Sequence, residues 1–85
     1  MFYVYVLKSG KDGNLYTGYT NDLRRRLVEH NSGKNTSTKS RTPFTLIYYK
    51  AYKDREDATR REKMLKEYGR SLGGLKRRIS KSLKS

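Results

Sequence analysis

Several residue types are absent or scarce in this 85-residue chain, which contains no cysteine, no tryptophan, one proline and one histidine. The lack of cysteine excludes a disulfide scaffold and any zinc site with thiolate ligands. A single histidine likewise excludes a zinc site built on two imidazoles. The longest apolar run near the N-terminus, residues 2–7, is far shorter than the ~20 residues that span a bilayer. It also lacks the basic lead of a signal peptide, so we expect a cytoplasmic protein.

Acidic residues are few relative to basic ones, since 8 Asp and Glu stand against 21 Lys and Arg for a formal net charge of +13. Such a charge favours a polyanionic partner, because binding releases the counterions condensed on a phosphate backbone. Eight tyrosines and two phenylalanines are too many aromatics for a disordered basic tail. We therefore expect a folded nucleic-acid-binding protein. Its length fits one domain over residues 1–85.

Three runs of β-branched and aromatic residues predict a three-stranded sheet. Residues 2–7 suit a strand buried on both faces, and residues 15–19 suit the return strand of a hairpin. The intervening residues 9–14 carry turn chemistry, with Asp-Gly at the tip. Residues 44–49 predict a third strand, which extends to Tyr52.

Apolar residues at helical spacing predict three helices. The first follows the capping residue Asp22 and stops at Gly33, and the second follows Asp54 and stops at Gly69. The basic tail over residues 70–85 predicts a short third helix. The order is therefore β-β-α-β-α-α, an α+β fold with a three-stranded, mainly antiparallel sheet flanked by helices.

Glu62 is a candidate metal ligand. It lies four residues after Ala58 and three before Leu65, on or beside the stripe that should face the sheet. A carboxylate near an apolar stripe costs free energy unless it is paired or bound to a metal. The alternative is an ordinary surface pair between Glu62 and Lys66 at i,i+4.

Arg26 and His30 form a second candidate pair, four residues apart on the first predicted helix. Arg24 and Arg25 should point further toward solvent. The functional interpretation is an arginine directed at a phosphate and a histidine that passes protons. The alternative is a solvated basic helix face on which Asp22 and Arg26 form an ordinary ion pair.

Tyr5 and Tyr16 fall on neighbouring strands of the predicted hairpin and are expected to come close. A tyrosine hydroxyl holds or deprotonates a water when a metal or an arginine lowers its pKa. The alternative is that these tyrosines only fill a small sheet core, with their hydroxyls at its rim.

Taken in order, these motifs resemble the GIY-YIG nuclease family, in the small stand-alone form found in bacteria. Tyr3-Val4-Tyr5 matches the GIY element and Tyr16-Thr17-Gly18 the YIG element, with Tyr3 in place of the first glycine and Thr17 in place of isoleucine. Residues 21–33 are similar to the first helix of the family and its exit. The match continues through Arg41-Thr42-Pro43 and through residues 58–66.

This resemblance implies a divalent-metal-dependent phosphodiester hydrolase. Glu62 matches the metal-binding glutamate of the family, and Arg26 matches its catalytic arginine. Tyr5 and Tyr16 match the two motif tyrosines, and which of them is the base stays open. His30 falls where members carry histidine or tyrosine. A lone glutamate suits one Mg²⁺ or Mn²⁺ ion that keeps several waters and takes a phosphate oxygen as a ligand.

We expect further residues to hold the nucleic acid, with cations along its backbone and Tyr19 or Tyr52 stacked on unpaired bases. The candidates for binding are Tyr19, Lys34, Lys39, Arg41, Lys66, Lys76, Arg77 and Arg78. The leading hypothesis is a structure- or single-strand-directed DNA endonuclease of repair or recombination, with a protein partner that supplies specificity. The alternative is a non-catalytic nucleic-acid-binding module or an accessory subunit of a larger repair complex.

Overall fold

The computed structural model describes residues 1–36, 38–67, 77–79 and 81–82. Its strands and helices are β1 (Phe2–Ser9), β2 (Leu15–Thr20), α1 (Leu23–Asn31), the 3-10 turn η1 (Lys39–Arg41), β3 (Phe44–Tyr52) and α2 (Arg55–Glu67). The predicted α+β order is confirmed through the second helix. The third helix, predicted from residue 70, falls mostly outside the described residues.

The sheet has the order β2-β1-β3, and β1 pairs antiparallel with both neighbours. As the central strand, β1 buries Val4 to Leu7 to at most 1% exposure. This confirms the prediction from its β-branched and aromatic composition. At the hairpin tip, Gly13 has φ +72°, a left-handed conformation that glycine adopts without steric cost.

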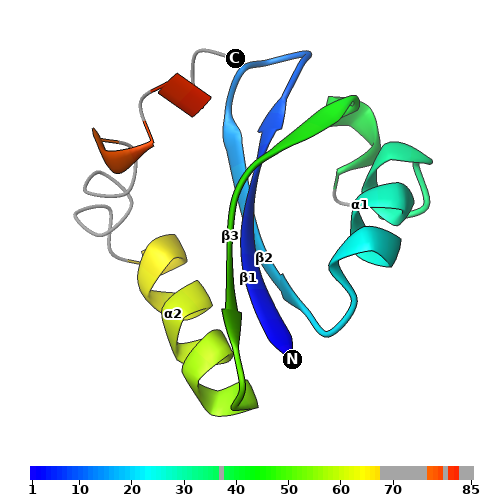
Figure 1. Cartoon of the computed structure of the whole chain (residues 1–85). Helices are drawn as coiled ribbons and strands as arrows, with labels where there is room; N and C mark the ends of the chain where they lie inside the picture. Colours follow the sequence, from blue (N-terminus) through cyan, green and yellow to red (C-terminus); the bar gives the residue numbers. More distant parts are fainter. Residues whose placement is uncertain (37, 68–76, 80, 83–85) are drawn as a thin grey trace.

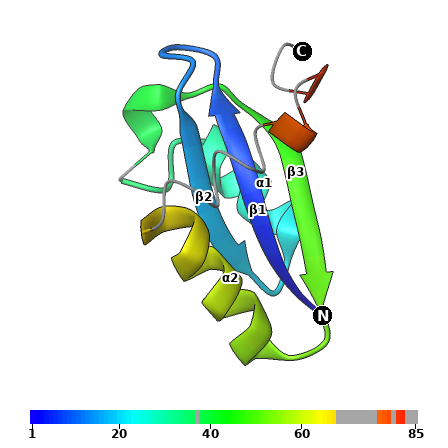
Figure 2. The ribbon, with the colours of Figure 1, turned by 90° about the vertical axis from the view of Figure 1, so that its left-hand side faces the viewer.

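The two helices cover opposite faces of this sheet (Figure 1). Seen from the side of α2, that helix crosses in front of the strands while α1 lies behind them (Figure 2). Alternate residues of β1 point to opposite faces. We call the two sides the α2 face, which contains Val4 and Val6, and the α1 face, which contains Tyr5 and Leu7.

Both predicted helix starts carry the expected capping residues. The Asp22 carboxylate accepts the backbone N–H of Arg25 at 3.1 Å at the start of α1. The Asp54 carboxylate accepts the backbone N–H of Glu56 at 2.7 Å at the start of α2. These bonds satisfy donors that have no partner inside the helix.

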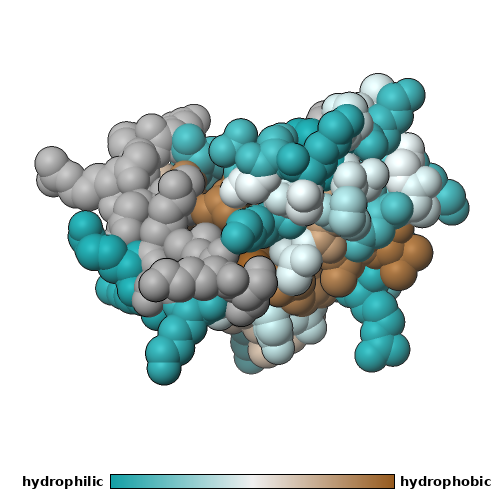
Figure 3. All heavy atoms as spheres, turned by 90° about the horizontal axis from the view of Figure 1, so that it is seen from above, coloured by the Kyte–Doolittle hydropathy of each residue, from teal (hydrophilic) through white to brown (hydrophobic). Residues whose placement is uncertain are grey.

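Polar and charged side chains cover much of the outer surface seen from one end of the molecule, with hydrophobic residues visible between them (Figure 3). Within the described ranges, no helix has the length and apolar character that a membrane span requires.

Candidate active site

The hairpin places Tyr5 and Tyr16 on neighbouring strands, as predicted, and both side chains belong to the cluster of the α1 face. Its register places Tyr5 opposite Gly18 and Tyr16 opposite Leu7. A Cβ atom at Gly18 would fall onto the hydroxyl and ring of Tyr5. Glycine is therefore required at this position, because the Tyr5 side chain lies directly across its backbone. Tyr5 is only 1% exposed, whereas Tyr16 is partly exposed.

His30 lies near the end of α1 with 0% exposure, and both of its ring nitrogens have partners. The Tyr5 hydroxyl is 2.9 Å from Nε2, and the Thr38 hydroxyl is 2.9 Å from Nδ1. Thr38 also donates to the backbone carbonyl of Asn35 at 3.5 Å. Since a threonine hydroxyl has one proton, we assign the Nδ1–H of His30 as donor to Thr38. Nε2 then accepts the hydroxyl proton of Tyr5.

Aromatic rings enclose the imidazole. The Tyr16 ring centroid lies 5.1 Å from that of His30, and the Phe44 ring centroid lies 5.9 Å away, both in edge-on arrangements. These contacts leave the polar edge of His30 to its two hydrogen-bond partners and keep the rest of the ring in an apolar surrounding.

Arg26 lies one helical turn before His30, close enough to the Tyr5 hydroxyl to affect its pKa. Its guanidinium Nη1 is 3.8 Å from a carboxylate oxygen of Glu29, and its side chain is 31% exposed. The alternative pair with Asp22 does not form, because the Asp22 carboxylate caps α1 instead. Arg24 and Arg25 are exposed, as expected.

Burial and the nearby guanidinium set the protonation states of this cluster. Burial raises the pKa of Tyr5, and its hydrogen bond with Arg26 opposes that rise. Burial also lowers the pKa of His30, and the positive charge of Arg26 lowers it further while Glu29 opposes the change. Tyr5 is therefore a neutral phenol and His30 a neutral imidazole at pH 7.

Glu62 comes from the opposite helix, between the buried residues Ala58 and Leu65. Its side chain is 22% exposed, and Oε2 lies 3.1 Å from the Lys66 ammonium. That ammonium lies 5.9 Å from the centroid of the Tyr16 ring. The surface pair considered as an alternative thus exists, and its lysine, Lys66, lies beside Tyr16 on the edge strand β2.

The donor set decides what kind of metal ion this site suits. No three Asp, Glu or His side chains of the described part of the chain group closely enough to hold a metal ion. Mg²⁺ commonly binds through one or two carboxylates and keeps several waters, which are joined by substrate phosphates. Glu62 is therefore compatible with a hydrated Mg²⁺ or Mn²⁺ ion that also takes an oxygen of the substrate phosphate as a ligand. It is not compatible with a metal site whose ligands all come from the protein.

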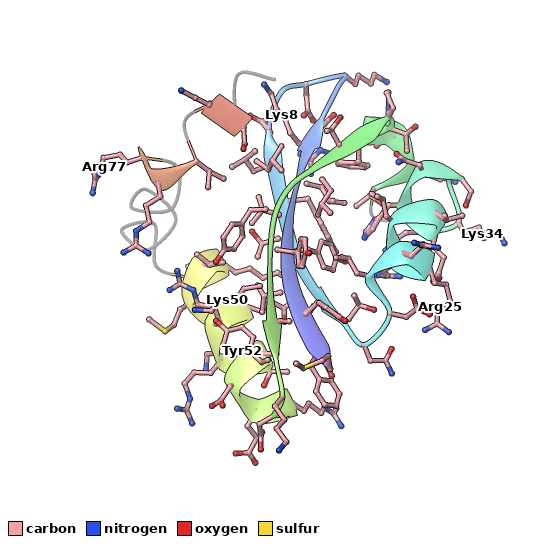
Figure 4. The ribbon with its side chains drawn as sticks, in the orientation of Figure 1. Lys8, Arg25, Lys34, Lys50, Tyr52 and Arg77 are labelled. Atoms are coloured by element: carbon pink, nitrogen blue, oxygen red, sulfur yellow. The ribbon has the colours of Figure 1, made fainter. Side chains whose placement is uncertain are left out.

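The residues predicted to bind nucleic acid are spread over the molecule. Lys34 and Lys39 are exposed, while Arg41 is held by Asp12 at 2.8 Å. Figure 4 shows Lys34 on the α1 side of the sheet and Arg77 on the opposite side. Arg78 is also exposed, and Lys76 lies outside the described residues.

The two aromatic residues considered for base stacking are partly buried. The Tyr19 ring lies parallel to the Phe2 ring, with centroids 6.4 Å apart. Tyr52 packs against the core of the α2 face, and the Lys50 ammonium lies 5.6 Å from its ring centroid.

Thr38 is the member of this cluster that sequence reasoning did not identify. It lies in a polar segment with the composition of an exposed loop, yet it is 0% exposed. Nothing in its local sequence distinguishes it from neighbouring serines and threonines. Only the fold shows that it contacts His30.

The family model for the GIY-YIG catalytic domain matches residues 1–80 of this chain. The chain belongs to the GIY-YIG family. The resemblance seen in Tyr3-Val4-Tyr5 and Tyr16-Thr17-Gly18 is thus confirmed, together with the fold that it implied. GIY-YIG domains are typically endonucleases, which places this protein in a nuclease family.

Several GIY-YIG relatives match most of the chain. A UPF0213 protein of Bacillus pumilus is 51% identical over 67 residues, and the match covers 78% of this chain but only 62% of that protein. The UPF0213 protein SAG0778 of Streptococcus agalactiae is 46% identical over 66 residues, covering 76% of this chain and 74% of the relative. The chain thus spans less than two thirds of the length of the first of these relatives.

A solved structure shows the same fold. The solution NMR structure of the UPF0213 protein BH0048 from Bacillus halodurans has a TM-score of 0.55 and 40% sequence identity. The alignment covers 89% of this chain and 86% of that protein.

Proposed function

We propose that this protein is a divalent-metal-dependent endonuclease that hydrolyses phosphodiester bonds in DNA. The observation that carries the proposal is the joint placement of a buried tyrosine–histidine pair and an arginine, with a glutamate at the adjacent strand edge. The buried hydrogen-bond chain from Tyr5 through His30 to Thr38 supports a catalytic role, because binding alone requires only the surface charge.

Hydrolysis requires a positioned water and stabilisation of the charge that develops on the phosphoryl oxygens. Tyr16 lies beside His30 and is partly exposed, so its hydroxyl is the one suited to hold the nucleophilic water. Arg26 is partly exposed and directed into the same cluster, where its guanidinium stabilises the phosphoryl oxygens. A Mg²⁺ or Mn²⁺ ion held by Glu62 would add Lewis-acid stabilisation of these oxygens and of the leaving oxygen.

The Tyr5–His30 pair supplies the proton acceptor. As the water oxygen bonds to phosphorus and the bond to the leaving oxygen breaks, the proton of the water passes to the Tyr5 oxygen. The Tyr5 proton passes to the free Nε2 of His30, 2.9 Å away. Thr38 keeps the other ring nitrogen protonated, so that Nε2 stays available. The leaving oxygen takes its proton from solvent.

The proposal extends to substrate and setting. We infer that residues 1–85 act as one catalytic domain with a basic tail over residues 70–85, and that the substrate is single-stranded or branched DNA. The high net charge and the absence of a sequence-reading motif support recognition of strandedness. Repair or recombination in the cytoplasm, with a protein partner for specificity, is the setting that this substrate favours.

A cleavage assay tests the proposal. Labelled single-stranded, duplex and branched DNA, with single-stranded RNA beside them, are incubated with the protein and Mg²⁺ or Mn²⁺. Wild type is compared with Glu62→Gln and Arg26→Ala, and Glu56→Gln serves as a control with the same charge change on an exposed part of α2. We expect cleavage by wild type and Glu56→Gln, and a loss of at least about a hundredfold in the other two. Absence of cleavage by wild type contradicts the proposal and favours the non-catalytic binding module. Equal cleavage rates for Glu62→Gln and Glu56→Gln contradict the role of Glu62 as the metal ligand.

A further inference from the structure

A polar pocket of about 520 Å³ adjoins the candidate active site. It lies where the start of β1, the end of β2, one side of α1 and the first residue of α2 meet. We call it the arginine pocket, and its main lining residues are Phe2, Tyr19, Asn21, Arg25, Arg26 and Arg55. Because Arg26 belongs to both the pocket and the catalytic cluster, a chain bound at one continues into the other.

The pocket carries excess positive charge. Arg25, Arg26 and Arg55 line it against a single acid, Glu29, which lies 3.5 Å from Arg25 and 3.8 Å from Arg26. One carboxylate shared by two guanidinium groups leaves net positive charge. Arg55 has no ion-pair partner among the residues that the structure describes. The pocket thus receives guanidinium groups from both helices, and a guanidinium can bind a phosphate through two parallel hydrogen bonds.

One wall of the pocket is aromatic and fixed in place. The rings of Phe2 and Tyr19 lie within 19° of parallel, and both pack against the core of the α2 face. A rigid aromatic wall beside a cationic site suits a stacked base, since any base presents a π face. The exposed Asn21 at the rim has an amide that can donate to and accept from a base edge.

We propose that the arginine pocket is a nucleotide subsite. It holds the nucleotide that neighbours the cleavage site, where Arg26 binds the phosphate that is hydrolysed. Its phosphate lies between Arg25 and Arg55, and its base lies against Tyr19. This inference rests on the proposed function, which supplies DNA as the substrate, and adds where a neighbouring nucleotide binds. A base seated against Tyr19 must be unpaired, so the pocket itself selects single-stranded or opened DNA.

Binding without metal tests the subsite separately from hydrolysis. The affinity for a fluorescent single-stranded thymidine oligonucleotide and for a duplex of equal length is measured in EDTA. Arg55→Gln is compared with Arg60→Gln, which removes the same charge from an exposed position of α2 outside the pocket. We expect Arg55→Gln to weaken single-strand binding about tenfold and to reduce the salt slope by about 0.7, and Arg60→Gln to change affinity less than about twofold.

The aromatic wall is tested by Tyr19→Leu, with Asn21→Ala as a second variant at an exposed position of the rim. Both are expected to weaken binding of the single strand, Tyr19→Leu by roughly tenfold, and to leave duplex affinity unchanged.

Equal effects of Arg55→Gln and Arg60→Gln, or equal losses on both DNA forms, overturn the subsite. So does oligoglutamate that competes as well as the oligonucleotide, since it identifies an acidic-peptide site. If hydrolysis is absent while these binding results hold, the subsite stands and only the catalytic proposal fails.

Discussion

The two faces of the sheet differ in chemistry although the same strand supplies both. On the α2 face, Val4 and Val6 pack with Ala58 and Leu65 in a cluster whose buried members are all apolar. On the α1 face, Tyr5 packs among apolar residues but also contacts the buried His30. The alternation of side chains along β1 therefore separates two tasks. One face stabilises the fold by apolar burial, and the other holds polar groups in a fixed arrangement.

The polar face is stable only because its groups satisfy one another. A buried imidazole without partners would cost the desolvation free energy of each ring nitrogen. Here both nitrogens of His30 have partners, and no described buried side-chain nitrogen or oxygen lacks one. Changes on the α1 face should therefore damage activity more than stability, and changes on the α2 face should do the reverse.

Tyr5→Phe gives the largest expected effect on activity. It removes only the hydroxyl that contacts His30 and Arg26 and keeps the ring in the core. We expect DNA cleavage to fall by about 10²–10⁴-fold, the usual contribution of a positioned proton-transfer group. Single-turnover cleavage measures the loss, and Tyr48→Phe on the α2 face is the matched control. Equal rates for the two variants would remove Tyr5 from the proton path.

Leu65→Ala should have the opposite signature. Leu65 is 1% exposed in the apolar cluster of the α2 face, so truncation leaves a cavity there. We expect the free energy of unfolding to fall by about 2–5 kcal/mol, measured by urea denaturation. Cleavage per folded molecule should stay unchanged, and Leu65→Met, which keeps the volume, should cost less than about 1.5 kcal/mol. A large loss of activity in folded Leu65→Ala would show that the two faces are coupled.

This separation of the faces was partly visible in the sequence. Strong local signals predicted the strands and the two helices, because capping at Asp22 and Asp54 and the apolar runs are properties of short segments. The family motifs identified Arg26 and Glu62 as site candidates by their order and spacing. Periodicity alone favoured a surface pair between Glu62 and Lys66, and the structure does contain this pair.

Contacts between distant segments were not visible in the sequence. Thr38 reaches His30 only because the polar segment after α1 folds back over the end of that helix. The arginine pocket depends on Arg55, which lies 29 positions after Arg26 in the sequence and lines the same pocket only because of how the two helices pack on the sheet. No local pattern encodes either contact, since each depends on how elements pack.

Gly18→Ala tests how tightly Tyr5 is seated. The new Cβ would overlap the Tyr5 hydroxyl and ring, which forces the phenol to move. We expect a loss of about 1–3 kcal/mol in the free energy of unfolding, together with reduced cleavage. Gly13→Ala is the comparison, because it strains the hairpin tip but meets no atom within 4 Å. It should lose stability and keep its activity per folded molecule, and any similar loss of activity there would contradict the special role of Gly18.

Thr38→Val should have a smaller effect on catalysis. It keeps the shape of the side chain but removes the hydroxyl that accepts the Nδ1–H of His30. The tautomer protonated on Nδ1 is then no longer stabilised, and Nε2 is no longer kept free of a proton. We expect cleavage to fall by about tenfold and the Nε2-protonated tautomer to appear in ¹⁵N NMR spectra. Thr38→Ser, which restores the hydroxyl, should recover both. Loss of activity in Thr38→Val without a change of tautomer would make Thr38 a packing residue only.

The smallest expected effect is on the pH dependence of stability. In the unfolded chain His30 binds a proton near pH 6.5, whereas burial and Arg26 lower its pKa in the fold. As the pH falls below about 6.5, the unfolded state gains its proton first, so the free energy of unfolding decreases by up to about 1.4 kcal/mol per pH unit. The loss ends once the pH passes the lowered pKa of His30 in the folded protein.

His30 is the only histidine in the chain, so a difference between wild type and His30→Gln in this window isolates its contribution. Urea denaturation at a series of pH values from about 5 to 8 should show a steeper acid loss for wild type. Parallel curves would mean that His30 titrates alike in both states, and the buried neutral imidazole of the α1 face would then be wrong.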